Sequence, residues 1–141
     1  PSGGSMIAGR SGKKWLLANG YFVGADANLA GADLSNVDFQ SINLSDANLR
    51  AADLSGADLS GLYLSYAELS GADLSGAILT GSNLDGATLN TATLTGVVSG
   101  GITGDVGLPT GWTLVDGYLI GPDTGSGTDS GTDSGTVTGT D

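Results

Sequence analysis

The chain from residue 27 to residue 96 reads ANLAG ADLSN VDFQS INLSD ANLRA ADLSG ADLSG LYLSY AELSG ADLSG AILTG SNLDG ATLNT ATLTG. A large apolar residue recurs at every fifth position, without interruption, from Leu29 to Leu94. A second inward candidate, usually Ala, stands two positions before each of them. The residue just before the large one is mostly Asp or Asn, the one after it is mostly Ser or Thr, and the next is Gly in eight of the fourteen repeats.

A five-residue period fits neither a single α-helix nor a flat β-strand. Five residues turn a helix by roughly 500°, so the leucines would spiral around it instead of forming a stripe. In a strand, an odd period places successive leucines on opposite faces. The chain must therefore bend once per repeat. The large residue and the alanine then point inward, and Gly or a small polar residue eases each corner.

The pattern A-[DN]-L-[ST]-G over residues 27–96, about half the chain, resembles that of the pentapeptide-repeat family. The resemblance implies an all-β fold, a right-handed quadrilateral β-helix or solenoid, with one pentapeptide on each side of the coil. The fourteen repeats would then make about 3.5 coils, a rod on the order of 17 Å long at about 4.8 Å per coil. Val97 and Ile102 keep the inward register beyond the last full repeat, so we expect the β-helix to cover residues 25–104.

Two similar segments flank the repeats. Residues 15–24 read WLLANGYFVG and residues 112–121 read WTLVDGYLIG. Asn-Gly and Asp-Gly are strong hairpin signals that favour a type I′ turn, so each segment is predicted to form a small β-hairpin with one Trp and one Tyr. One interpretation makes both hairpins caps over the open coil ends. The other makes them related surfaces that stack head to tail, a contact that builds filaments.

The expected organisation follows from these elements. Residues 1–12 are predicted to be a flexible N-terminal segment or a cloning scar, and residues 13–24 the N-terminal capping hairpin. The β-helix comes next, followed by a linker and the C-terminal hairpin over residues 105–121. Residues 122–141 are a low-complexity tail of Gly, Thr, Asp and Ser, a composition typical of flexible segments.

The charge of the chain excludes some partners. Fifteen acidic and four basic residues give a formal net charge of −11, and there is no His or Cys. This balance argues against direct binding to nucleic acid, and the lack of a long apolar run argues against membrane insertion. Arg10, Lys13 and Lys14 lie near the N-terminal hairpin, whereas carboxylates gather toward the C-terminal end. Opposite charges favour end-to-end contact, although salt screens them beyond about 8–10 Å.

Stacking residue n over n+20 predicts rows on the surface of the rod. Asp33, Asp53 and Asp73 would form one acidic row, where repulsion should raise some pKa values or attract a cation, unless the carboxylates mainly serve local hydrogen bonds. A convex rod has no cleft, so we expect no enzyme activity and no catalytic, cofactor or metal residues. The weak exception is calcium at the Asp-rich tail, whose oxygen ligands would come from Asp123, Asp129 and Asp133.

The preferred functional interpretation is a non-enzymatic building block that associates with itself, head to tail, through its ends or tail into a fibre. An extracellular or cell-surface location is favoured over the cytoplasm. One alternative is an acidic protein-binding module, because some members of the family resemble duplex DNA and bind type II topoisomerases; the rod would span only about five base pairs at roughly 3.4 Å each. Another is a passive spacer domain. The candidate interface residues are Trp15, Tyr21, Tyr63, Tyr66, Trp112 and Tyr118.

Overall fold

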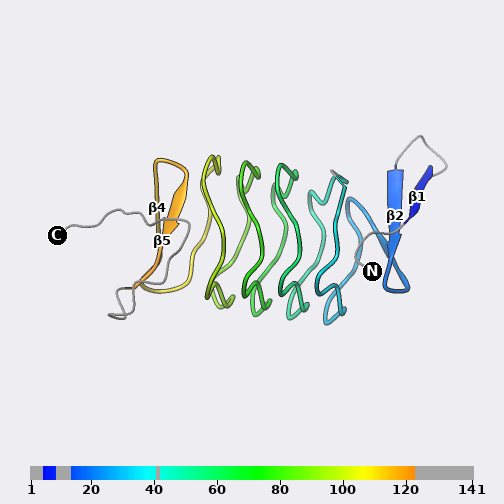
Figure 1. The fold of residues 1–141 in the computed structure, drawn as a ribbon, viewed down its shortest axis with the longest axis horizontal. Helices are drawn as coiled ribbons and strands as arrows, with labels where there is room; N and C mark the ends of the chain where they lie inside the picture. The colour runs from blue at the N-terminus through cyan, green and yellow to red at the C-terminus, as the bar shows by residue number, and fades with distance from the viewer. Residues whose placement is uncertain (1–4, 9–13, 41, 123–141) are drawn as a thin grey trace.

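The computed structural model describes residues 5–8, 14–40 and 42–122 of the chain, with side chains described from residue 14 onward. It is a rod of stacked coils with a small sheet at each end (Figure 1). At the N-terminal end, strands β1 (Ser5–Ala8), β2 (Lys14–Ala18) and β3 (Tyr21–Val23) form an antiparallel sheet in that order. At the C-terminal end, β4 (Thr113–Val115) pairs antiparallel with β5 (Tyr118–Ile120).

Between the two sheets, each coil pairs with the next through its backbone. Parallel bridges join residue n to residue n+20, from Asn28↔Asn48 to Asn83↔Thr103, and the final bridge, Thr88↔Gly107, is one residue shorter. In each bridge the chain both donates and accepts. Asp53, for example, donates its N–H to the Ala32 carbonyl at 2.8 Å and its own carbonyl accepts the Leu34 N–H at 2.8 Å. Residues twenty positions apart therefore stack on one another, and the bridge-forming residues line up in surface rows along the rod.

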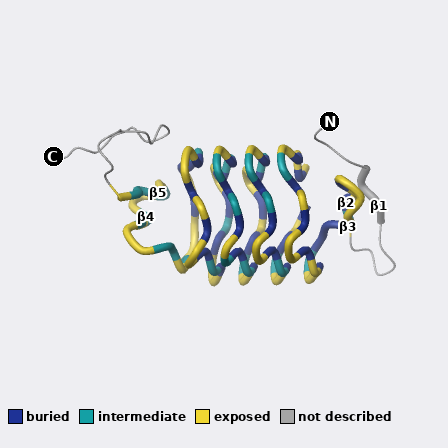
Figure 2. The backbone as a smooth tube through the Cα atoms, turned by 90° about the horizontal axis from the view of Figure 1, so that it is seen from below, coloured by how far each residue is buried: buried dark blue, intermediate teal, exposed yellow. Residues whose placement is uncertain are grey.

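The interior is filled by the five-residue series. Its large members and the preceding alanines are buried, and Phe39 takes the place of a leucine without exposure. Figure 2 shows the inward-facing backbone positions as buried and the corners as exposed. One alanine row instead carries Ile42, Leu62 and Ser82. The buried Ser82 hydroxyl is satisfied because it donates to the Leu79 carbonyl at 2.9 Å.

The corners explain the glycine in the repeat. The Leu54 carbonyl accepts the Ala57 N–H at 3.0 Å, which closes a four-residue turn. Gly56, the third residue of this turn, has φ +67°. A hydrogen-bonded turn with positive φ at its third residue alone is a type II turn, which strongly favours Gly at that position, and Ser55 before it does not have positive φ. Ala51 and Tyr66 occupy equivalent corners at φ 58° and 60°, so these two residues adopt a conformation that costs an L side chain free energy.

The N-terminal sheet corrects one expectation. Residues 5–8 belong to the segment predicted to be flexible, yet they form strand β1, with Ile7 opposite Trp15. The physical reason is that this strand pairs with an edge of β2 that would otherwise leave its backbone groups unpaired. Residues 1–4 and 9–13 lie outside the described part of the chain, as do 123–141, which include the three tail aspartates considered for calcium.

Candidate functional site

The N-terminal hairpin lies over the first coil. Its turn residues Asn19 and Gly20 have φ values of 49° and 86°, the two positive values that a type I′ turn requires. Leu16 and Val23, paired across the hairpin, are fully buried against the core. The Asn19 Nδ2 donates to the carbonyl of Asp33 at 3.1 Å, which ties the tip of the hairpin to the coil.

The C-terminal hairpin closes the last coil in a related way. Its turn residues Asp116 and Gly117 have φ values of 49° and 83°. Leu119 is buried in the core, and its N–H donates to the hydroxyl of Ser99 at 3.0 Å. The Ile102 N–H donates to the carbonyl of Gly117 at 3.2 Å. Side-chain burial and backbone hydrogen bonds therefore both hold this hairpin on the coil.

Both tryptophans pack on their own chain, each over the last glycine of its hairpin segment. A Cβ built on Gly24 would lie 2.7 Å from Cε3 of Trp15, and one built on Gly121 would lie 2.7 Å from Cη2 of Trp112. Only glycine leaves room for these rings. Both rings are half-buried and contact the hydrophobic core, so most of the free contact area at the ends comes from other residues.

Those other residues are the exposed apolar side chains of the hairpins. Leu17 and Phe22 face each other across the N-terminal hairpin with exposed fractions of 37% and 60%. Val115 and Tyr118 form the corresponding exposed pair at the C-terminal end, at 50% and 42%. Sequence reasoning named Tyr118 and the exposed Tyr21 but missed Leu17, Phe22 and Val115. Their alternation with buried neighbours along a strand is the signal that could have identified them.

Tyr63 and Tyr66 lie on the coils, between the two ends, and the structure does not bring them together with the hairpins. They are 59% and 62% exposed. Tyr63 stands in the surface row between Asn43 and Asn83. The Tyr66 ring lies against the next corner, where a Cβ on Gly86 would be 2.5 Å from its Cδ1 atom. The six candidate residues thus divide into two ends and one side patch.

The acidic row is in the predicted register, with Asp53 bridged to Asp33 on one side and to Asp73 on the other. Its electrostatics differ from expectation. Each carboxylate accepts from the serine two residues later; Asp73, for instance, accepts the Ser75 hydroxyl at 2.6 Å and the Ser75 N–H at 2.9 Å. These hydrogen bonds lower the pKa values of Asp33 and Asp73, with the serine hydroxyl as the largest cause. A rise in pKa is therefore wrong for these two groups and the alternative of local hydrogen bonds holds, because the serine donors outweigh the opposing effect of desolvation.

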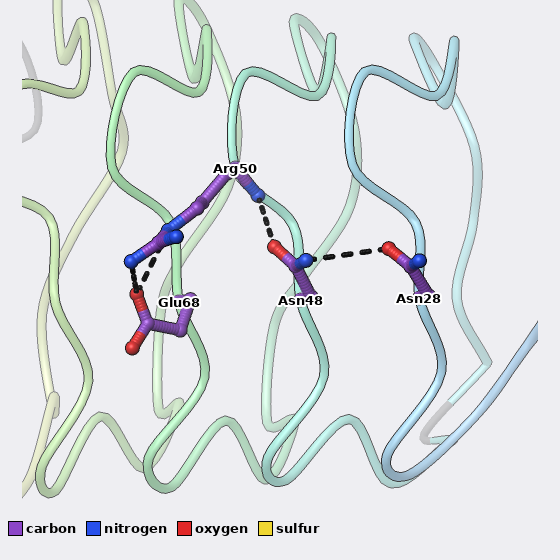
Figure 3. Close-up of polar contacts among 4 residues, drawn as sticks. All are labelled: Asn28, Asn48, Arg50 and Glu68. Carbon is purple, nitrogen blue, oxygen red and sulfur yellow. Dashed lines mark hydrogen bonds and ion pairs between the residues drawn. The ribbon is translucent and has the colours of Figure 1, made fainter.

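A neighbouring row carries the one arginine on the coils. Asn48 donates from Nδ2 to Oδ1 of Asn28 at 3.3 Å, and Arg50 reaches Oε1 of Glu68 through Nε at 3.1 Å and a second nitrogen at 3.0 Å (Figure 3). The Arg50 and Glu68 side chains are 61% and 43% exposed. Exposed pairs of this kind contribute only about 0–1 kcal/mol, so this row links successive coils without forming a binding site.

Metal-binding clusters and membrane-spanning helices are both absent from residues 5–8, 14–40 and 42–122. No three carboxylates there are grouped so that they could hold a metal ion. The same part of the chain contains no helix long and apolar enough to cross a membrane.

The repeats match a family model described as pentapeptide repeats, in 8 copies, over residues 22–61 and 57–96. The chain belongs to the pentapeptide-repeat family. Membership implies the right-handed quadrilateral form of the β-helix, and the proteins of this family are generally structural or binding modules. The coils described above are thus the pentapeptide-repeat solenoid, and a hairpin closes each of its two ends.

Several solved pentapeptide-repeat proteins are similar to the chain. A protein of the Arabidopsis thaliana thylakoid lumen is 32% identical, with 57% of this chain and 63% of that one covered and a TM-score of 0.38. A protein from Nostoc Pcc 7120 is 34% identical over 62% of this chain and 70% of its own, with a TM-score of 0.25. QnrB1, a plasmid-mediated fluoroquinolone resistance protein, is 21% identical over 55% and 60%, with a TM-score of 0.27. No curated protein matches the chain.

Proposed function

We propose that this pentapeptide-repeat protein is a non-enzymatic structural module that associates with copies of itself through its two ends. The observation that carries the proposal is the exposed apolar pair on each end hairpin, Leu17 with Phe22 and Val115 with Tyr118. The sides of the rod present mainly Asp, Asn, Ser and Thr, and Tyr63 and Tyr66 are the exposed aromatic residues there. Apolar area removed from water stabilises a contact by about 25 cal/mol per Å².

Charge supports the same surfaces. Lys14 is exposed at the N-terminal end, whereas Asp105 and Asp116 are exposed at the C-terminal end. Fields of opposite sign increase the rate of encounter between two surfaces, and their effect falls as salt is added. Self-association through the ends should therefore weaken, without disappearing, when the ionic strength is raised, because the apolar contact is not screened.

Light scattering coupled to size-exclusion chromatography tests the proposal on the full chain. The weight-average mass should rise with protein concentration, and Phe22→Ser should lower it. Tyr63→Ser is the matched control, because Tyr63 is equally exposed but lies on the side of the rod. A chain that stays monomeric at high concentration, with no fibres by electron microscopy, would refute self-association. A spacer role would then account better for the fold.

The acidic rows favour a second candidate, a protein-binding module of the DNA-mimic type that acts on a type II topoisomerase. Two neighbouring rows hold stacked aspartates, which are Asp33, Asp53 and Asp73 in one and Asp38 and Asp58 in the other. Neither row is acidic along its whole length. Thr93 follows Asp73 in the first row, and Ile78 and Val98 follow Asp58 in the second. A DNA supercoiling assay with gyrase decides this candidate, which is eliminated if added protein leaves supercoiling unchanged.

A further inference from the structure

The two end hairpins are copies of one motif, yet they bury opposite faces. At the N-terminal end, the face with Leu16, Ala18 and Val23 is buried against the first coil, and the face with Leu17 and Phe22 is exposed. At the C-terminal end, Leu119 is buried and its partner Leu114 packs against the core. Leu114 and Leu119 are the sequence equivalents of Leu17 and Phe22.

Each end therefore presents the face that the other end uses for packing. The exposed N-terminal face is the counterpart of the face that covers the C-terminal side of a coil. Val115 and Tyr118, exposed at the C-terminal end, correspond to Ala18, which is buried, and to Tyr21, which stays 37% exposed at the edge of the packed face. The motif thus has two packing faces, and in the isolated chain each hairpin has covered only one of them. A hairpin with rods on both sides would bury both.

Resting on the proposed self-association, we propose that successive copies of this chain join head to tail. The partner of the N-terminal face, with Leu17 and Phe22, is the C-terminal face of a second copy, with Val115 and Tyr118. Within one chain the equivalent of each face packs on the end of a coil, so each face is of a kind that the motif buries, and pairing the two faces between chains would extend the axis of the rod. The contact is heterologous, since it joins two different surfaces, and it leaves one free end of each kind for the next copy.

Charge complementarity selects this polarity over the symmetric alternatives. A head-to-tail contact brings Lys14 toward the end that carries Asp105 and Asp116, all three of them exposed. Two N-terminal ends would bring Lys14 toward its own copy. Two C-terminal ends would bring aspartates together. Juxtaposed like charges disfavour a contact.

A mixing experiment tests the polarity. Phe22→Asp blocks the N-terminal end and Val115→Asp blocks the C-terminal end, because an unpaired carboxylate is costly to bury. In a head-to-tail assembly every contact needs one end of each kind, so each variant alone should have the mass of a single chain. An equimolar mixture retains one intact end of each kind, so it should form a dimer and stop there. Light scattering over a concentration series measures all three samples.

The outcomes separate the polarity from self-association itself. If Val115→Asp alone still forms dimers while Phe22→Asp does not, the contact joins two N-terminal ends and the inference is overturned. The reverse result assigns the contact to two C-terminal ends and also overturns it. If both variants assemble like the unmodified chain, the hairpin faces are not used. If the unmodified chain is itself monomeric, the proposed function fails. Circular dichroism verifies folding, and Leu17→Ser and Tyr118→Ser replace any variant that unfolds.

Discussion

One row of corners on the rod offers two substitutions that should change the free energy of unfolding in opposite directions. Gly31, Ala51 and Gly71 occupy successive coils at φ +71°, +58° and +74°. Ala51 is the third residue of a turn that is closed by the Ala52 N–H and the Leu49 carbonyl at 3.1 Å. A Cβ added at Gly31 would meet no atom within 4 Å, so steric contact with neighbours does not complicate that substitution.

The magnitude follows from two opposing terms. The left-handed conformation costs a residue with a Cβ about 1–2 kcal/mol. Replacing Ala by Gly removes this cost but increases the freedom of the unfolded chain, which costs about 0.4–1 kcal/mol. Ala51→Gly should therefore stabilise the protein by about 0.5–1 kcal/mol. Gly31→Ala should destabilise it by a similar amount, because the same two terms apply with reversed sign.

Urea unfolding followed by circular dichroism measures both variants. With a slope of about 1–3 kcal/mol per M, the midpoint should move by roughly 0.2–1 M, upward for Ala51→Gly and downward for Gly31→Ala, with the slope unchanged. Ala52→Gly is the control in the same coil. Ala52 is buried and its φ is not positive, so this substitution should only destabilise. A downward shift for Ala51→Gly, or shifts of one sign for both corner variants, would refute the reasoning.

Three further predictions concern the core, the C-terminal cap and the acidic row. Leu54→Ala should cost about 2–5 kcal/mol in the free energy of unfolding, because Leu54 is fully buried between stacked coils, and calorimetry measures the loss. Ser99→Ala should leave the buried N–H of Leu119 without its acceptor, at a cost of about 1–3 kcal/mol, and should increase quenching of tryptophan fluorescence by acrylamide. Ser75→Ala should raise the pKa of Asp73 measured by NMR. Hydrogen bonding lowers that pKa on folding, so Asp73 stabilises the folded protein at pH values above its unfolded pKa near 3.8. This stability is lost as the pH falls through the lower folded pKa. The variant should therefore lose less stability on acidification than the unmodified protein.

The core and the corners were predictable because the period leaves the chain no freedom there. A strict repeat of five fixes which residues point inward and where the chain bends, and even the atypical Phe39 is buried like the leucines. The stacking of residue n on residue n+20 followed from the resemblance to the pentapeptide-repeat family, in which four pentapeptides make one coil. The bridge from Asp33 to Asp53 agrees with this stacking. Local geometry that depends on one dihedral angle does not all follow from the period: Gln40 has φ 53° although it stands one position before the usual corner.

The end surfaces were less predictable for physical reasons. Leu16 and Leu17 have the same side chain, so composition cannot tell which of the two faces the coil, and only packing decides that Leu16 is the buried one. Strand β1 was missed because residues 5–8 show no apolar alternation of their own, and they form a strand by pairing with the edge of β2. The pKa shift at Asp33 follows the alternative of local hydrogen bonds, because its direction depends on whether the Ser35 donors reach the carboxylate, which the row pattern alone does not decide.

The four-sided coil turns the number of repeats into an angle. Because backbone pairing joins residue n to residue n+20, inserting or deleting one pentapeptide keeps every ladder intact but rotates one end hairpin by a quarter turn relative to the other. Four pentapeptides restore the original orientation and only lengthen the rod. In a chain of copies joined by their ends, the same rotation would recur at every junction. Repeat number would thus change the helical twist of such a fibre in quarter-turn steps per copy, on top of the rotation that the contact itself imposes.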